Sequence, residues 1–246
     1  MIIGSKLLFY KDLPSTNTTA ASLIKKDNLQ EGTIVYTNHQ SAGRGYSGNS
    51  WHSDEGKNLL ISLILYPTFI NPEDEFIISM TISLGICDFL LRSVPECAIK
   101  WPNDIYVKND KIAGILIDGS LTGNKIEYVI AGIGLNVNQE IFPGSIPNPV
   151  SLRMLTGKSH DLAWCLEMLA SDLDKRYKQL IAGESAIIKR EYVSMIYRLN
   201  AWGEFRDSNG IFSGKVLTVH DDGQIVIERQ DGSQRKYYFK EMEFIL

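Results

Sequence analysis

Residues 43–51 combine three glycines with an arginine and a tryptophan, in the order Gly-Arg-Gly-Tyr-Ser-Gly-Asn-Ser-Trp. Glycines let a loop bring its backbone N–H groups close to phosphate oxygens, and the guanidinium of Arg44 adds a permanently charged, planar set of donors. The loop has neither the P-loop spacing nor the dinucleotide-binding spacing. The segment therefore indicates an anion-binding loop of another kind, and a flexible surface turn is the alternative.

Residues 100–104, Lys-Trp-Pro-Asn-Asp, place a cation, a large aromatic ring and two short polar groups around a proline that constrains the backbone. These side chains could form one wall of a polar pocket. The alternative is a strand that ends in a β-turn, with Trp101 in the core and Asn103 and Asp104 capping the turn.

Two further segments place polar groups and glycines within apolar runs. Lys111 begins a run that has Gly114 three residues later, where a ligand or another backbone could approach closely. Its ammonium could balance anionic oxygens, although an edge lysine that discourages strand pairing is the alternative. Residues 132–138, Gly-Ile-Gly-Leu-Asn-Val-Asn, are equally open between a ligand site and a turn.

The elements that must position these segments follow from hydrophobic periodicity. Strands are expected at 7–10, 32–38, 59–66, 99–107, 111–117 and 126–137, and helices at 16–26, 76–91, 159–181 and 186–197. Asn71 and Pro72 predict a helix start, Ser159 a helix cap, 108–110 a tight hairpin and 119–124 a turn. The sequence thus predicts an α+β fold with a mixed, mainly antiparallel sheet and packed helices.

The chain changes character after residue 200. Short β-rich runs at 214–219, 224–229 and 234–239 alternate with one Asn-Gly and two Asp-Gly hairpin signals. We expect a small β-barrel there that gains stability by docking on the main domain.

The overall composition restricts the class of protein. The 246 residues are 44% hydrophobic and 22% charged, and the net charge of −4 argues against a general nucleic-acid binder. The three cysteines are odd in number and far apart, which favours reduced thiols in the cytoplasm. A secretion signal is not expected, and no uncharged apolar run reaches the roughly 20 residues of a membrane-spanning helix.

Taken together and in this order, the segments resemble the biotin protein ligases. The resemblance covers Ser15-Thr16-Asn17, Gln40 with the glycine-containing loop, the Lys-Trp-Pro-Asn-Asp segment, Lys111 to Leu116, the Gly132 to Asn136 run and the β-rich end of the chain. It implies a class II synthetase-like catalytic domain at 1–199 and an SH3-like β domain at 200–246.

The resemblance also implies the site residues. Biotin would contact Ser15, Thr16, Asn17, Gln40, Gly43, Arg44, Lys111 and Gly114. ATP would contact Arg44, Gly45, Trp51, Lys100, Asn103, Asp104 and Asn136. Arg44, Lys111 and Asp104 would be catalytic, with Asp104 also the candidate ligand for Mg²⁺ bound with ATP. No tightly bound cofactor is expected.

The implied reaction has two steps. ATP would activate biotin as biotinyl-5'-AMP with loss of pyrophosphate, and a lysine of a biotin carboxyl carrier protein domain would then take the biotin. No nucleic-acid or membrane partner is expected, and the chain would be a monomer or a homodimer, with a sheet edge near residues 120–138 available for pairing. The stand-alone class of ligase is implied, because no helix-turn-helix domain fits before Ser15.

This sequence departs from the most basic version of the loop at Tyr46, Ser47 and Asn49, where other members carry arginines. Two alternatives follow for retention of the adenylate: the smaller number of charges weakens the hold on it, or aromatic cover from Tyr46 replaces the packing of guanidinium groups. The rival enzyme is a lipoate ligase, which would need a deep apolar tunnel. The rival from another class is a non-catalytic binding protein.

Overall fold

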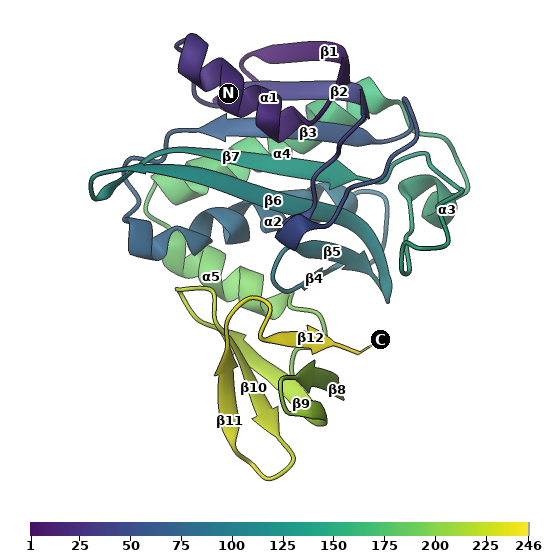
Figure 1. The fold of residues 1–246 in the computed structure, drawn as a ribbon, viewed down its shortest axis with the longest axis vertical. Helices are drawn as coiled ribbons and strands as arrows, with labels where there is room; N and C mark the ends of the chain where they lie inside the picture. The colour runs from purple at the N-terminus through teal and green to yellow at the C-terminus, as the bar shows by residue number, and fades with distance from the viewer. Residues whose placement is uncertain (246) are drawn as a thin grey trace.

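The computed structural model describes residues 1–245, which form two β-sheets with helices packed on the larger one (Figure 1). The strands are β1 (Leu7–Leu13), β2 (Ile34–Gln40), β3 (Leu59–Leu65), β4 (Ala98–Lys100), β5 (Asp104–Val107), β6 (Asp110–Thr122), β7 (Lys125–Leu135), β8 (Trp202–Asp207), β9 (Gly210–Val219), β10 (Ile225–Arg229), β11 (Gln234–Tyr237) and β12 (Met242–Phe244). The α-helices are α1 (Thr16–Lys26), α2 (Phe76–Leu90), α3 (Leu152–Thr156), α4 (Leu162–Ile181) and α5 (Ser185–Ser194). The short 3₁₀ helices are η1 (Tyr46–Gly48) and η2 (Pro72–Asp74).

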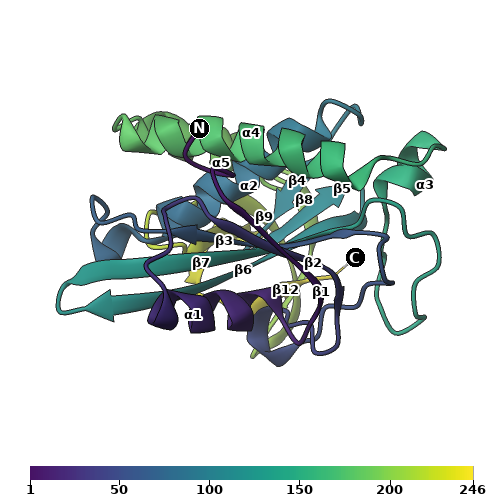
Figure 2. The same ribbon diagram turned by 90° about the horizontal axis from the view of Figure 1, so that it is seen from above.

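The larger sheet has seven strands in the order β1-β2-β3-β7-β6-β5-β4. β1 and β2 pair in parallel and the other neighbours pair antiparallel. This arrangement confirms the expected mixed, mainly antiparallel sheet. β3 is buried along its whole length, because α1 covers one face of the sheet while α2 and α4 cover the other (Figure 2).

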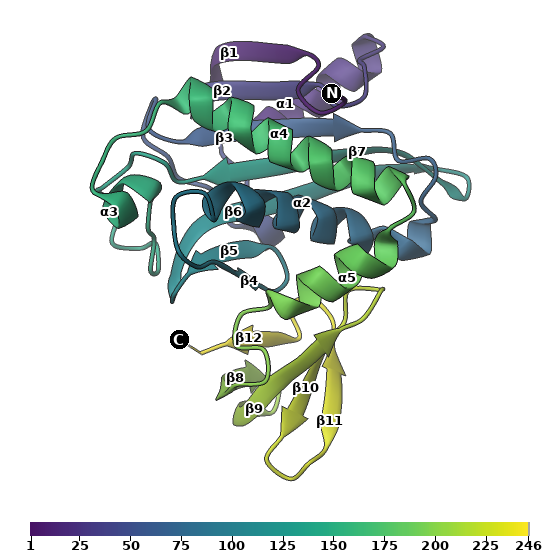
Figure 3. The same cartoon turned by 180° about the vertical axis from the view of Figure 1, so that it is seen from behind.

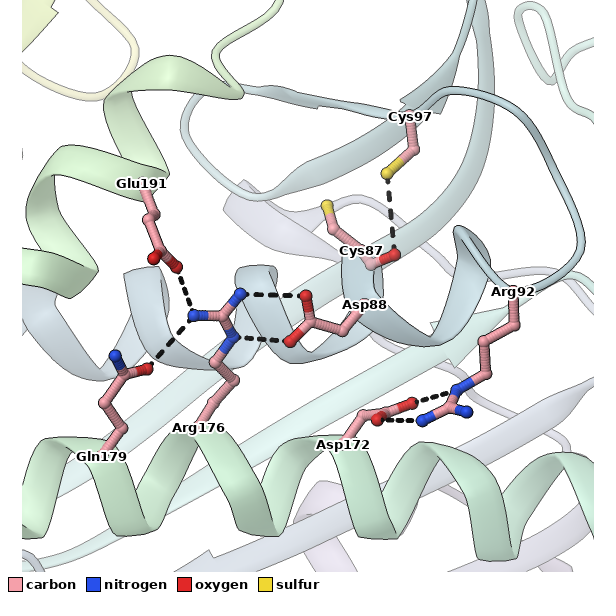
Figure 4. Close-up of polar contacts among 8 residues, drawn as sticks. All are labelled: Cys87, Asp88, Arg92, Cys97, Asp172, Arg176, Gln179 and Glu191. Atoms are coloured by element: carbon pink, nitrogen blue, oxygen red, sulfur yellow. Dashed lines mark hydrogen bonds and ion pairs between the residues drawn. The ribbon is translucent and has the colours of Figure 1, made fainter.

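α2 is the central helix that its apolar sequence predicts. It lies under α4, with α5 continuing toward the C-terminal sheet (Figure 3). Asp88 is the one residue of α2 that is not buried by the packing, and Arg176 of α4 binds it through Nε at 2.5 Å and Nη2 at 2.9 Å. Arg176 also binds Glu191 of α5, so one guanidinium joins three helices (Figure 4). The neighbouring Cys87 and Cys97 are free thiols.

The strand expected over 99–107 is in fact two strands. β4 and β5 pair antiparallel, with Lys100 opposite Asp104, and residues 101–103 form the turn between them. Pro102 has no N–H to donate, so the ladder is not continued through it. The turn brings both ends of the Lys-Trp-Pro-Asn-Asp segment to one point. The hairpin between β5 and β6 is confirmed, but β6 continues through the turn expected at 119–124 as far as Thr122.

Two expected helix starts are wrong. Asn71 and Pro72 begin the single-turn η2, where the Asn71 side chain makes no cap hydrogen bond, and α2 begins only at Phe76. α4 is capped by Asp161, whose carboxylate accepts the Trp164 N–H at 2.8 Å. Ser159, the expected cap, instead donates its hydroxyl to the side chain of Asn138 at 3.3 Å. α3 was not expected.

The expected C-terminal β structure is a five-stranded antiparallel sheet in the order β11-β10-β9-β8-β12. β8 and β12 were not predicted from the sequence. β12 has only three residues, and β8 has no clear alternation of apolar and polar residues. The sheet docks on the larger one through the Trp101 indole, which donates to the Gly223 carbonyl at 2.8 Å. The boundary at residue 199 stays a prediction. No helix within residues 1–245 is both long and apolar enough to cross a lipid bilayer.

The sheet edge expected near 120–138 is only partly right. β7 lies between β3 and β6 and is therefore an interior strand. β5 pairs with β6 only as far as Gly114, so the later residues of β6 lack a neighbouring strand on that side among the strands that the structure describes. Whether the chain is a monomer or a homodimer stays open as a prediction.

Candidate active site

Three glycines make room for large side chains on the face of the sheet that α1 covers. Gly114 of β6 pairs with Gly134 of β7. A Cβ atom on Gly134 would lie 2.3 Å from the indole of Trp51, and one on Gly132 would lie 2.3 Å from the Asn17 side-chain oxygen. Such distances are far below van der Waals contact. The glycines in these strands therefore serve close approach of Trp51 and Asn17 to the sheet.

Asp118 of β6 anchors two of the predicted site residues. Asn17 donates from Nδ2 to Asp118 Oδ2 at 2.9 Å and to the Leu116 carbonyl at 3.2 Å. Arg44 Nη1 lies 3.1 Å from the same carboxylate oxygen, while the Ser62 hydroxyl donates to Asn17 Oδ1 at 2.5 Å. Both polar atoms of the buried Asn17 amide thus have protein partners. Arg44 is half exposed, so its guanidinium stays accessible from the surface.

The glycine loop (residues 43–51) is a small closed hairpin. Arg44 and Ser50 form an antiparallel bridge, and the Gly45 N–H donates to the Asn49 carbonyl at 2.7 Å. η1 forms its tip. The backbone N–H of Gly45 is therefore used within the loop, and Arg44 supplies the charge.

The start of α1 meets the end of β2. Gln40 Oε1 accepts the Thr16 N–H at 2.8 Å and the Thr16 hydroxyl at 3.1 Å, so it satisfies an N–H group that the helix cannot. Ser15 is buried at the N-cap position but makes no side-chain cap bond, which leaves its hydroxyl for another partner. Gly43 fits between Trp51 and Gln40, because a Cβ there would lie 2.4 Å from the Trp51 carbonyl oxygen and 3.1 Å from Gln40 Nε2.

Two hollows adjoin on this face. The first hollow, with a volume of about 200 Å³, is lined by most of the residues predicted to bind biotin: Ser15, Thr16, Asn17, Gln40, Arg44, Lys111 and Gly114. Gly43, which was also predicted to bind biotin, is not one of the residues that line this hollow. The second hollow, about 480 Å³, is lined by four of the residues predicted to bind ATP: Trp51, Lys100, Asp104 and Asn136. Arg44, Gly45 and Asn103 line the first hollow.

Lys111, Asp104 and Trp51 belong to the wall that the two hollows share. Lys111 Nζ lies 2.6 Å from Asp104 Oδ1 and 5.6 Å from the centre of the Trp51 ring. The pair is only partly exposed, which strengthens its electrostatic interaction relative to a surface pair. The single cation and single anion thus stand where two ligands, one in each hollow, would meet.

The second hollow has its own cation. Lys100 Nζ lies 3.2 Å from the Tyr106 hydroxyl and 5.7 Å from the ring of Phe244, which belongs to β12 of the C-terminal sheet. Burial lowers the pKa of Lys100, and the nearby Asp104 carboxylate opposes that shift. An anion bound beside Lys100 would stabilise its protonated form.

Two buried polar atoms at the hollows have no hydrogen-bond partner among the described residues. They are Trp51 Nε1, a donor, and Asn136 Oδ1, an acceptor. The other end of the Asn136 amide donates to the Val150 carbonyl at 3.0 Å, so its orientation is fixed. Buried groups of this kind usually have a partner, so both suit contact with a ligand.

Asp118 and Tyr106 were not predicted as site residues. Asp118 could have been noticed as a lone carboxylate in the otherwise apolar and small run Ile-Leu-Ile-Asp-Gly. Tyr106 carries no such signal, because a tyrosine within a strand is ordinary. Within residues 1–245, His, Cys, Asp and Glu form no cluster of three or more that could hold a metal ion without another ligand.

Comparison with known proteins places this geometry in a family. The sequence profile of the biotin/lipoate A/B protein ligase family matches residues 9–136, more than half of the chain. The bifunctional ligase/repressor BirA of Bacillus subtilis is 31% identical over 244 residues, which cover 96% of this chain and 73% of that protein. The chain belongs to the biotin/lipoate A/B protein ligase family.

Two further members of this ligase family match nearly end to end. The biotin–[acetyl-CoA-carboxylase] ligase of Paracoccus denitrificans is 29% identical, with 90% of this chain and 95% of that protein covered. The biotin protein ligase of Aquifex aeolicus, solved in complex with biotin and ATP, superimposes with a TM-score of 0.79 at 26% identity, over 97% of this chain and 98% of that chain. The expected α+β fold and the resemblance to biotin protein ligases are confirmed.

Proposed function

We propose that this protein is a biotin protein ligase that joins biotin to ATP as biotinyl-5'-AMP and then transfers biotin to a lysine of a carrier domain. The observation that carries the proposal is the wall shared by the two hollows, where Lys111 and Asp104 lie between the biotin side and the ATP side. An acyl-adenylate spans two ligand sites in the same way.

The first hollow suits the ureido ring of biotin. Such a ring presents two N–H donors and one carbonyl acceptor. Ser15 and Thr16 supply hydroxyl groups, and the Gln40 amide is held in place by its bonds to Thr16. Polar groups in fixed positions give a ligand site its orientation and specificity. A lipoate ligase has no use for such a set.

The second hollow suits the nucleotide. The Trp51 ring and the Lys100 ammonium offer an aromatic face and a cation, while Asn136 Oδ1 offers a free acceptor. Arg44, from the glycine loop, lines the adjoining first hollow. We infer that the phosphates lie between Arg44 of the first hollow, Lys100 of the second and Lys111 of the shared wall.

The first step is the attack of the biotin carboxylate on the α-phosphate, which brings two anions together. Lys111 and Arg44 offset that repulsion and stabilise charge that develops on the phosphate oxygens. Asp104 fits as the single carboxylate that Mg²⁺ needs beside phosphate oxygens and water, and Mg²⁺ would neutralise charge on the departing pyrophosphate. Lys111 must then exchange Asp104 for the carboxylate of biotin.

In the second step the neutral amine of a carrier lysine attacks the acyl carbon of the adenylate, and AMP leaves. Positioning supplies much of the rate, so no nucleophilic side chain of the enzyme is required. The name of the Paracoccus denitrificans relative points to a carboxylase as the carrier's source. The three free thiols support a cytoplasmic location as part of this proposal.

Exchange of labelled pyrophosphate into ATP tests the proposal on the purified protein, with biotin and lipoate supplied separately. Exchange with biotin alone is expected. Exchange with lipoate alone would move the function to lipoate ligation, and no exchange with either acid would support the binding-protein alternative. Transfer of labelled biotin to a carrier domain, and not to the same domain with its acceptor lysine changed to arginine, tests the second step.

A further inference from the structure

The tip of the glycine loop contacts the C-terminal sheet. The ring of Tyr46 in η1 meets the ring of Phe239 edge to face, with centroids 6.0 Å apart and planes at 90°. Phe239 lies in the connection between β11 and β12. Edge-to-face pairs are favourable because the positive edge of one ring meets the negative face of the other. Burial also raises the pKa of Tyr46, as expected for a ring that leaves water.

Contacts other than the one with Tyr46 fix the position of the Phe239 ring. Its ring lies 5.2 Å from that of Trp101 and 5.8 Å from that of Phe76, both in the catalytic part of the chain. The turn that carries it is closed by Glu241, whose carboxylate accepts the Tyr238 N–H at 2.7 Å. Phe239 is therefore a fixed contact point rather than a mobile side chain.

The base of the glycine loop is anchored separately. Arg44 pairs with Asp118, and Trp51 packs on Gly134. Tyr46 is at the other end of the loop, in η1, and lines the first hollow as well. A loop held at its base alone could swing, whereas a second contact at its tip restrains it.

We propose that Tyr46 and Phe239 form an aromatic latch that holds the glycine loop closed over the first hollow, which makes Phe239 a positioning residue for retention of the adenylate. This rests on the proposed function. Contacts between rings are not screened by salt, whereas exposed ion pairs are.

The rate at which the adenylate escapes from the enzyme tests the latch. After one turnover with biotin and ATP, Tyr46→Ala and Phe239→Leu should each release biotinyl-5'-AMP about three- to tenfold faster, as loss of an aromatic pair predicts. Tyr46→Phe is the matched control and should stay within about twofold, since the ring pair needs no hydroxyl. The double variant should be no faster than Tyr46→Ala, and the ratio to wild type should not change with salt.

Hydrogen exchange gives a readout that needs no activity. Amides of residues 44–50 should exchange at least about threefold faster in Phe239→Leu than in the wild-type protein, although the substitution is far away in sequence. Melting temperatures within a few degrees of wild type show that the C-terminal sheet is still docked.

Unchanged loop exchange in Phe239→Leu, or escape rates that multiply in the double variant, would overturn the latch. Failure of the wild-type protein to exchange pyrophosphate would instead refute the proposed function. Hydrogen exchange would then still decide whether Phe239 restrains the loop, so the two failures are distinct.

Discussion

Lys111 Nζ lies 2.6 Å from Asp104 Oδ1 in the wall shared by the two hollows. The two residues sit on neighbouring strands, and β5 and β6 hold them across the hairpin that joins them. An anion that arrives in either hollow must compete with Asp104 for this ammonium. The same atom, Lys111 Nζ, would therefore both bind the incoming anion and stabilise the charge that develops there.

Lys111→Ala should lower biotin-dependent pyrophosphate exchange about 100- to 1,000-fold, the usual effect of removing a fixed charge at a reacting centre. The melting temperature should change little, because the side chain is partly exposed. Lys125→Ala, an exposed lysine at the start of β7, is the matched control and should keep full exchange. Wild-type exchange by Lys111→Ala would remove Lys111 from the mechanism.

Arg44→Ala should release the adenylate about three- to tenfold faster, as expected for a half-exposed guanidinium that contacts phosphate. Asp118→Asn should produce a smaller increase, since it frees the guanidinium without removing it and leaves an amide beside Asn17. The salt dependence of escape should weaken in Arg44→Ala. Arg153→Ala, which breaks a surface pair with Glu140, controls for a general loss of charge. Escape at the wild-type rate in Arg44→Ala would show that another group holds the phosphate.

Gly134→Ala should raise the Kd for biotin at least about tenfold, because the new methyl group would lie 2.3 Å from the Trp51 ring and push it into the hollows. Gly119→Ala is the matched control, with its nearest neighbour 3.7 Å away on the adjacent strand. Isothermal titration with biotin measures both. Equal Kd values in the two variants would mean that Trp51 does not define the hollow.

Asp174 should make stability depend on pH. Burial pushes the pKa of Asp174 up, but hydrogen bonds from Lys178 and from the N–H groups of Ile3 and Ile2 outweigh it and lower the pKa overall. Because the pKa is lower in the folded state, the ionised carboxylate stabilises the fold at pH values above its unfolded pKa of about 3.9. That stability is lost as the pH falls through the lower pKa of the folded state.

Asp174→Asn should therefore unfold about 1–3 kcal/mol more easily at pH 7. The difference in the free energy of unfolding between wild type and Asp174→Asn should narrow as the pH falls from about 5 to about 2. Urea unfolding at a series of pH values measures it. A gap that stays constant over that range would assign the stability to packing instead of charge.

Long apolar segments were predictable from sequence, whereas the partners of polar caps were not. α2 and β3 follow from runs of buried residues, and their type needs no knowledge of their neighbours. The start of α4 was misplaced because Ser159 and Asp161 are both good caps, and only the contact of Ser159 with Asn138 decides between them. β12 is three residues long and exists through its pairing with β8.

The site shows the same division. Gly114 was predicted to allow a ligand or another backbone to approach closely, and in the folded sheet the Trp51 side chain approaches it. The glycines of β7 were left open between a ligand site and a turn, and the folded sheet shows that Trp51 and Asn17 pack on them. Asp118 escaped notice because its role depends on Asn17 and Arg44, which are distant in sequence. The roles of the individual residues toward biotin and ATP stay predictions for the experiments above.

The first residues of the chain determine where anything joined to it would emerge. The N–H groups of Ile2 and Ile3 are bound by Asp174 of α4, and Ile3 is fully buried, while Met1 is exposed. α4 covers the face of the sheet opposite α1 (Figure 2). A tag or an additional domain attached ahead of Met1 would therefore extend from the side of the molecule that α4 covers, opposite α1.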